Sequence, residues 1–392
     1  MSEWKEYRFS DFVNVNPIVK LPSNELVSFV EMKDLDSGKR FCYPNAERIN
    51  GSGSKFEEYD TLFARITPCL ENGKICQVRG LKNKKGLGST EFFVFRGKEN
   101  ISDTNFVYYL SRWDEVRSHA EINFDGTSGR QRVPKECFDD LLLNLPPDLN
   151  EQRTITSILT SLDDKIDLLH RQNATLEKMA ETLFRQWFVE EAKEEWKEVC
   201  LIDIMGGIVD NRGKTPPTLD YKTEYPLIEV NAINSNSCLV NYDVIRKYVD
   251  EDTYKNWFRK HLMINDIIVS TVGTIGVFSL FLNNVGCIAQ NLVGLRFYRN
   301  LSFFVYNFFK NNVETLLNLD IGGVQPSIKL PHLLDLTLKL PPQSLIDDYH
   351  NLVKENYNKI STNQSQIRTL TQLRDTLLPK LMSGEVSLKL RN

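Results

Sequence analysis

Two short segments carry side chains that are suited to binding nucleic acid, and the first is Arg130-Gln131-Arg132. Arginine can make two hydrogen bonds to guanine, and glutamine can make two to adenine, in the major groove of DNA. The segment follows Gly126–Gly129, where glycine lets the backbone approach a ligand closely. An exposed turn between two structural elements would have the same composition, so both interpretations stay open.

The second segment runs from Lys74 to Lys85 and contains basic residues but no acidic one. Such a segment suits contacts to phosphates, which position a protein on DNA without reading its sequence. Most charged runs are simply solvated surfaces, and that interpretation also remains.

The second half of the chain contains related segments. Asn211–Pro217 is basic, contains glycine and is stiffened by proline, and Gly126–Pro134 resembles Gly323–Pro331. The residues that we expect to contact DNA are Lys74, Lys82, Lys84, Lys85, Arg130, Gln131, Arg132, Arg212, Lys214, Thr215, Gln325 and Lys329.

Patterns typical of enzymes are absent from the sequence. There is no phosphate-binding Gly-x-x-x-x-Gly-Lys loop, and Gly273–Gly276 lacks the dinucleotide pattern. The Pro-Pro pairs precede Asp148 and Gln343, where an amino-methyltransferase motif needs an aromatic residue. The histidines are scattered without metal-ligand spacing. We therefore expect a chain that is no enzyme and holds neither a metal nor a cofactor.

Two long helices are the elements that must position these segments. From Ile155 to Trp187, mostly apolar residues recur at alternating spacings of 4 and 3, and no proline or glycine interrupts them. A second, more polar seam runs from Ile346 to Met382. The residues expected in the core of this coiled coil are Ile155, Leu159, Leu162, Ile166, Leu169, Asn173, Leu176, Leu183, Ile360, Ile367, Leu370 and Leu377.

The two seams predict an antiparallel pair within one chain, although a coiled coil between two molecules would show the same pattern. Asn173 in the seam either fixes the register of the pair or lies at its solvent edge.

The sequence is internally duplicated. Glu3-Trp4-Lys5-Glu6 returns as Glu195-Trp196-Lys197-Glu198, and Leu141–Pro147 returns as Leu336–Pro342. A shorter echo links Val30-Glu31-Met32 to Ile228-Glu229-Val230. Each copy therefore ends with a Leu-Pro-Pro motif and a long helix.

Each copy should begin with a mixed α+β domain. Runs rich in β-branched and aromatic residues predict strands at Leu26–Val30, Leu62–Ile66, Phe92–Phe95, Ile267–Thr271 and Leu292–Phe297. Asn105–Val116 and Ser302–Leu317 are expected to be helical. The predicted boundaries are 1–145 and 193–340 for the two α+β domains, and 146–192 and 341–386 for the two long helices that follow them.

Composition constrains the location of the protein more than its partner. The net charge of −4 is not typical of a nucleic-acid binder. The seven cysteines form no Cys-x-x-Cys pair and no signal peptide is evident, which favours a reducing cytoplasm. The uncharged run Ile267–Leu282 contains glycine, serine and threonine, so we expect two buried strands and no membrane span.

Several motifs together resemble one known family. Leu145–Arg153, with the helical residues that follow, resembles the first conserved helix of the specificity subunit of Type I restriction–modification enzymes. Leu377–Glu385 is similar to the end of that family's second conserved helix, and Arg212–Pro216 resembles its Gly-x-Thr-Pro element. The chain departs from the family at Ser344–Tyr349, where a Glu-Gln-basic run is usual.

The resemblance implies a non-catalytic subunit that binds double-stranded DNA. Each domain would read half of a bipartite asymmetric site, while the helices set the gap and dock two methyltransferase subunits. Motor and nuclease restriction subunits would join for cleavage, and S-adenosylmethionine, ATP and Mg would be bound by the partner subunits. The alternatives are the specificity subunit of a related two-subunit restriction enzyme, or a coiled-coil adapter with two protein-binding domains.

Overall fold

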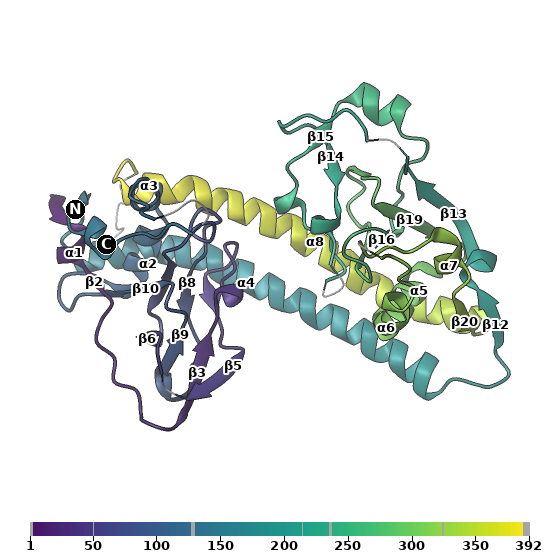
Figure 1. Ribbon diagram of the computed structural model, residues 1–392, viewed down its shortest axis with the longest axis horizontal. Helices are drawn as coiled ribbons and strands as arrows, with labels where there is room; N and C mark the ends of the chain where they lie inside the picture. The colour runs from purple at the N-terminus through teal and green to yellow at the C-terminus, as the bar shows by residue number, and fades with distance from the viewer. Residues whose placement is uncertain are drawn as a thin grey trace, which may run out of the picture. The chain divides into compact units, whose positions relative to one another are not determined.

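The computed structural model describes residues 3–49, 51–126, 130–213, 215–234, 237–323 and 325–386. The chain divides into two compact units, the first formed by 1–169 with 366–392 and the second by 170–365. Each unit combines sheets with part of both long helices, α4 (Leu149–Arg185) and α8 (Gln343–Met382), as Figure 1 shows. The predicted α+β class with two long helices is confirmed.

The described residues of the first unit form three sheets. Their strand orders are β2-β10-β7-β8-β4, β5-β3-β9-β6 and β1-β11, and helix α2 packs against β10, β8 and β7. The bounds are β1 Lys5–Arg8, α1 Phe9–Phe12, β2 Val13–Val15, β3 Leu26–Val30, β4 Phe41–Cys42, β5 Ala46–Ile49, β6 Ser54–Glu57, β7 Thr61–Ala64, β8 Ile75–Val78, β9 Lys85–Gly88, β10 Phe92–Gly97, α2 Thr104–Arg112, α3 Asp114–Ile122 and β11 Leu142–Leu145.

The second unit repeats this plan with fewer strands among its described residues. Its orders are β13-β19-β16-β17, β15-β14-β18 and β12-β20, and the uncharged run after Asp266 forms the buried strands β16 and β17, as predicted. The bounds are β12 Lys197–Cys200, β13 Met205–Asp210, β14 Tyr225–Ile228, β15 Tyr248–Val249, β16 Ile267–Ser270, β17 Phe278–Leu280, β18 Cys287–Ile288, β19 Leu292–Phe297, α5 Ser302–Asn311, α6 Val313–Leu317, α7 Leu330–Leu334 and β20 Thr337–Leu340.

The duplication extends to individual ion pairs. In the first unit Arg96 on β10 makes a bidentate pair with the buried Asp60, at 2.6 and 2.7 Å. In the second unit Arg296 on β19 makes the same pair with the buried Asp266, at 2.9 and 2.7 Å. Each aspartate precedes the central strand of its sheet, so both copies fix this strand to its neighbour in the same way.

In the first unit, the start of α4 packs antiparallel to the end of α8. Ile166 and Leu169 form an apolar cluster with Ile367. Three residues before Ile166, the Asp163 carboxylate accepts a hydrogen bond from Arg374 at 2.8 Å and another from the Tyr109 hydroxyl at 2.7 Å. This buried ionic contact joins both helices to α2.

In the second unit, the end of α4 packs antiparallel to the start of α8. The buried Asn363 donates its side-chain amide to the buried Asn173 at 2.8 Å. The Tyr349 hydroxyl donates to the backbone oxygen of Ala180 at 3.0 Å. Asn173 therefore has a polar partner in the seam, a pairing that favours one register.

The buried stripe of each helix is wider than a two-residue heptad seam. Asp163 and Phe184 occupy the same positions along α4 as Tyr357 and Leu378 occupy along α8, when residues are counted from the start of each helix. All four side chains are buried. These positions face the sheets and helices of the unit, whereas a heptad pattern considers only the partner helix. As a result, five residues expected in the core are half-buried: Leu162, Leu176, Leu183, Leu370 and Leu377.

Candidate nucleic-acid interface

Several loops of the first unit converge at the ends of strands β3, β7 and β9. Strands β3 and β9 are parallel, with Val30 opposite Gly88, so the segments that follow them leave the sheet at one edge. The backbone of Arg65, just after β7, donates to Glu91 at 3.0 Å, and Val133 donates to Arg65 at 2.8 Å. We call the segments 31–32, 65–67, 89–91 and 130–133 the loop edge.

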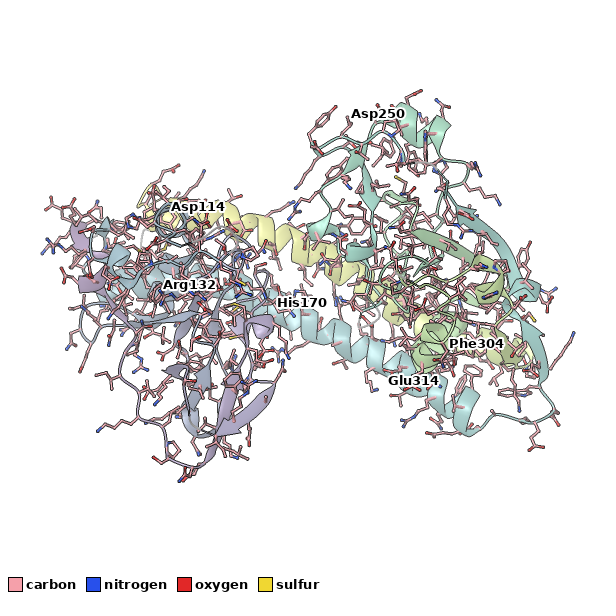
Figure 2. The ribbon with its side chains drawn as sticks, in the orientation of Figure 1. Asp114, Arg132, His170, Asp250, Phe304 and Glu314 are labelled. Atoms are coloured by element: carbon pink, nitrogen blue, oxygen red, sulfur yellow. The ribbon has the colours of Figure 1, made fainter. Side chains whose placement is uncertain are left out.

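Arg132 lies on the loop edge and is labelled in Figure 2. Its backbone forms antiparallel bridges with Ile66 and Asp125, and its guanidinium donates to Glu91 from Nε at 3.0 Å and from Nη2 at 2.7 Å. This ion pair raises the pKa of Arg132, which is charged in any case. A contact between Arg132 and a base would require the guanidinium to leave or share Glu91.

The neighbours of Arg132 play different parts in this loop. Arg130 is exposed, whereas the half-buried Gln131 uses its backbone to hold the turn. The Gln131 oxygen accepts from the Thr67 N–H at 3.0 Å, and its N–H donates to Thr67 Oγ1 at 3.2 Å. Thr127, Ser128 and Gly129 lie outside the described residues.

Three of the four lysines in the basic segment lie apart from these residues. Lys82, Lys84 and Lys85 lie at or before the start of β9, while the loop edge follows the end of that strand. Lys82 Nζ lies 3.3 Å from Glu47, and Lys85 Nζ lies 3.8 Å from Glu57. Much of the local positive charge is therefore balanced within the unit, although Lys84 is exposed.

Lys74 has a structural contact. Its Nζ donates to the backbone oxygen of Met32 at 2.8 Å, and the side chain is half-buried. Lys74 therefore ties β8 to the segment that follows β3.

The predicted residues of the second unit are also dispersed. Arg212 pairs with Asp210 at 2.8 and 2.6 Å, which lowers the pKa of that aspartate. Thr215 lines a small pocket, and the Gln325 side chain lies close to Gly273. Lys329 is exposed just before α7, and Lys214 lies outside the described residues.

Backbone hydrogen bonds correct the predicted alignment of the two loops. The Gly273 N–H donates to Pro326, as the Thr67 N–H donates to Gln131. Ser327 forms the antiparallel bridge that corresponds to that of Arg132. Arg132 therefore corresponds to Ser327 and not to Lys329. The alignment of the sequence alone was wrong because it matched Gly126 with Gly323 and Pro134 with Pro331.

Both units have a pocket beside the parallel strands. In the first unit it has a volume of about 520 Å³ and is lined by Glu31 and Arg48, whose side chains lie 2.7 Å apart. In the second unit it has a volume of about 160 Å³ and is lined by Glu229 and Lys247, which lie 2.9 Å apart. Sequence reasoning did not select these residues for function, although the echo of Val30–Met32 in Ile228–Val230 contained the signal.

Two negative findings concern only the part of the chain that the structure describes. Within the ranges given above, no group of three or more His, Cys, Asp or Glu residues is arranged to hold a metal ion. Across the same ranges, no helix is both long and apolar enough to cross a membrane.

Both halves of the chain match one family model. The model describes the Type I restriction modification DNA specificity domain, and it matches residues 1–178 and again 193–368. The chain belongs to this family. It is accordingly a DNA-sequence specificity subunit of a Type I restriction–modification system, and its two matched segments correspond to the duplicated halves.

Individual relatives are distant in sequence. The Type I restriction enzyme MjaIX specificity subunit of Methanocaldococcus jannaschii is 24% identical over 307 residues, which cover 72% of this chain and 69% of that protein. The HindI specificity subunit of Haemophilus influenzae is 32% identical over 199 residues, but these cover 48% of this chain and only 42% of that protein.

A solved structure shares the fold. The crystal structure of the Type I restriction–modification system S subunit from M. genitalium is similar with a TM-score of 0.54. The comparison covers 96% of both chains at 13% sequence identity. At this identity the likeness supports the architecture alone.

Proposed function

We propose that each unit reads one half of a bipartite asymmetric site in double-stranded DNA. The observation that carries this proposal is the duplication, down to matching backbone bonds and ion pairs, within a chain of the specificity family. Two similar folds with different loop residues suit two different half-sites. In this proposal α4 and α8 set the gap between the half-sites.

The chain itself then performs no catalysis and works in the cytoplasm within a larger complex. Two methyltransferase subunits would supply S-adenosylmethionine chemistry, and restriction subunits would use ATP and Mg for movement and cleavage. A two-subunit enzyme, in which modification and cleavage share one partner, remains the second candidate. Purifying the complex and identifying its subunits would distinguish these assemblies.

Exchange of one unit tests the proposal. The core of the second unit includes Phe184 from α4, Phe188 just after it, and Tyr349 and Tyr357 from α8. An exchange of residues 170–365 with the matching part of a relative therefore preserves this core better than an exchange of the predicted domain alone. We expect mapped methylation to keep one half-site and change the other. A change in both half-sites, or in neither, would contradict separate reading.

Exposed apolar residues on the helices are candidate contacts for the methyltransferase subunits. Met179 is 51% exposed on α4 and Leu373 is 45% exposed on α8, at the same position counted from the start of each helix. We expect Met179→Asp and Leu373→Asp each to weaken the docking of one subunit, as seen in the mass of the purified complex. Gln372→Asp, at an exposed neighbouring position, is the control and should leave the mass unchanged.

A further inference from the structure

The two pockets described above occupy equivalent places in their units. Phe29 and Val30 of β3 pair in parallel with β9, and Leu227 and Ile228 of β14 pair in parallel with β18. Glu31 and Glu229 follow directly, and each precedes a short 3-10 turn. The same carboxylate therefore lines the same pocket in both copies.

Each carboxylate also has a basic partner on the neighbouring antiparallel strand or just before it. Arg48 lies on β5, which pairs with β3, and Lys247 directly precedes β15, which pairs with β14. The Arg48 guanidinium lies 3.7 Å from the centre of the Phe29 ring. In the second unit Leu227 occupies the place of Phe29, so the arginine–aromatic pair is replaced by lysine and an aliphatic residue.

These charged groups remain accessible. The side chains of Glu31 and Glu229 are 31% and 35% exposed, and those of Arg48 and Lys247 are 54% and 47% exposed. Lys33 also contacts Glu31 and lowers its pKa, so this carboxylate is ionised at neutral pH and can only accept hydrogen bonds. A surface carboxylate would normally repel DNA phosphates, but here neighbouring cations offset its charge.

The two pockets share the carboxylate but differ in other lining residues. Ser89 and Thr90 line the first pocket, while Ala289, Gln290 and Asn291 line the second. Features shared by both copies suit a task that both copies perform, and features that differ suit discrimination between two half-sites.

We propose that Glu31 and Glu229 each accept a hydrogen bond from the exocyclic amino group of a base, cytosine or adenine, in the half-site read by their unit. Carboxylates are known to accept from cytosine N4 in the major groove, and adenine presents its N6 amino group there. Arg48 and Lys247 hold the carboxylates and reduce their repulsion from phosphates. This proposal rests on the proposed reading of one half-site by each unit.

The test uses the full chain with its methyltransferase partner and maps methylation on a randomised DNA library. We expect Glu31→Gln to change or relax one base position in one half-site, and Glu229→Gln to do so in the other. Glu47→Gln and Glu251→Gln are matched controls, because both carboxylates pair with a lysine but line neither pocket. The controls should keep the parent pattern.

A second measurement excludes a merely structural role. Deleting the amino group of the identified base should weaken binding by the parent chain by roughly tenfold or more, and should have little further effect on the glutamine variant. An unchanged methylation pattern in both variants would overturn this proposal and leave half-site reading intact. A uniform loss of binding with a lower melting temperature would also overturn it, since the carboxylate would then only support the turn. If the parent complex methylates no bipartite site, the proposed function itself fails.

Discussion

The buried contact between Asp163, Arg374 and Tyr109 makes a quantitative prediction about stability. The side chains of Asp163 and Arg374 are 2% and 4% exposed. Arg374→Met keeps most of the side-chain volume but removes the guanidinium from the buried Asp163 carboxylate, which keeps its hydrogen bond from the Tyr109 hydroxyl. Breaking such a buried pair costs about 3–5 kcal/mol. That is a large part of the total stability of about 5–15 kcal/mol typical of a folded protein.

Removing the whole contact should be much less harmful. In the double variant Asp163→Leu with Arg374→Met, the Tyr109 hydroxyl is left buried without its acceptor, at about 1–3 kcal/mol. Adding Tyr109→Phe removes this hydroxyl group. The free energy of unfolding of the triple variant should therefore be within about 1 kcal/mol of the parent value, or higher.

Urea unfolding of the purified chain, followed by circular dichroism, measures these differences. Lys178→Met is the control, because the Lys178 side chain is 70% exposed beside Glu181 and should contribute less than about 1 kcal/mol. If the free energy of unfolding of Arg374→Met lies within about 0.5 kcal/mol of the parent value, the contact is solvated and the reasoning is wrong.

Three further predictions concern the helices. Burial lowers the pKa of His350, which stacks on Phe303, so its contribution to stability is complete above the unfolded pKa of about 6.5 and is lost as the pH falls through the folded pKa. The melting temperature of the parent should thus fall more between pH 7.5 and 5.5 than that of His350→Phe, and equal falls would contradict this. Asn173→Leu should lower the free energy of unfolding in urea by about 1–3 kcal/mol, because it leaves the buried Asn363 amide with only the long 3.5 Å contact to Gln172. The double variant with Asn363→Leu should recover the loss, and a single variant as stable as the parent would argue against this account. Inserting four residues after Asn173 lengthens α4 by about 6 Å, close to two base-pair steps of about 3.4 Å, so mapped methylation should show both half-sites unchanged but farther apart. An unchanged gap would mean that the helix does not set it.

The helices were predictable because their determinants are local. Regular apolar spacing predicted their positions, and repeated motifs revealed the duplication. Proline and glycine are absent from the first seam, whereas α8 contains Pro379 close to its end. The exact face of each helix that is buried could not be predicted from the sequence. Asp163 and Glu177 are polar, yet both are buried because Arg374 and Lys310 approach them from elsewhere in the chain. Sequence periodicity contains no information about such distant partners.

The residues of the candidate interface were harder to predict for the same reason. Lys82 and Lys85 form part of a conspicuous basic run, but Glu47 and Glu57 approach them through strand pairing. Glu31 and Arg48 show no local pattern, and only the pairing of β3 with β5 brings them together. Comparing the two copies is informative here, since the motif around Glu31 returns around Glu229.

The sharing of both helices between the units has a consequence for synthesis on the ribosome. The second unit is continuous in sequence, whereas the first unit includes residues 366–392 as well as 1–169. Its core needs Leu378, Leu381 and Met382, which pack with residues such as Phe106. Domains generally fold in the order in which they emerge, but here the unit that starts first is completed last. Until the C-terminal helix emerges, the nascent chain must carry an incomplete apolar core.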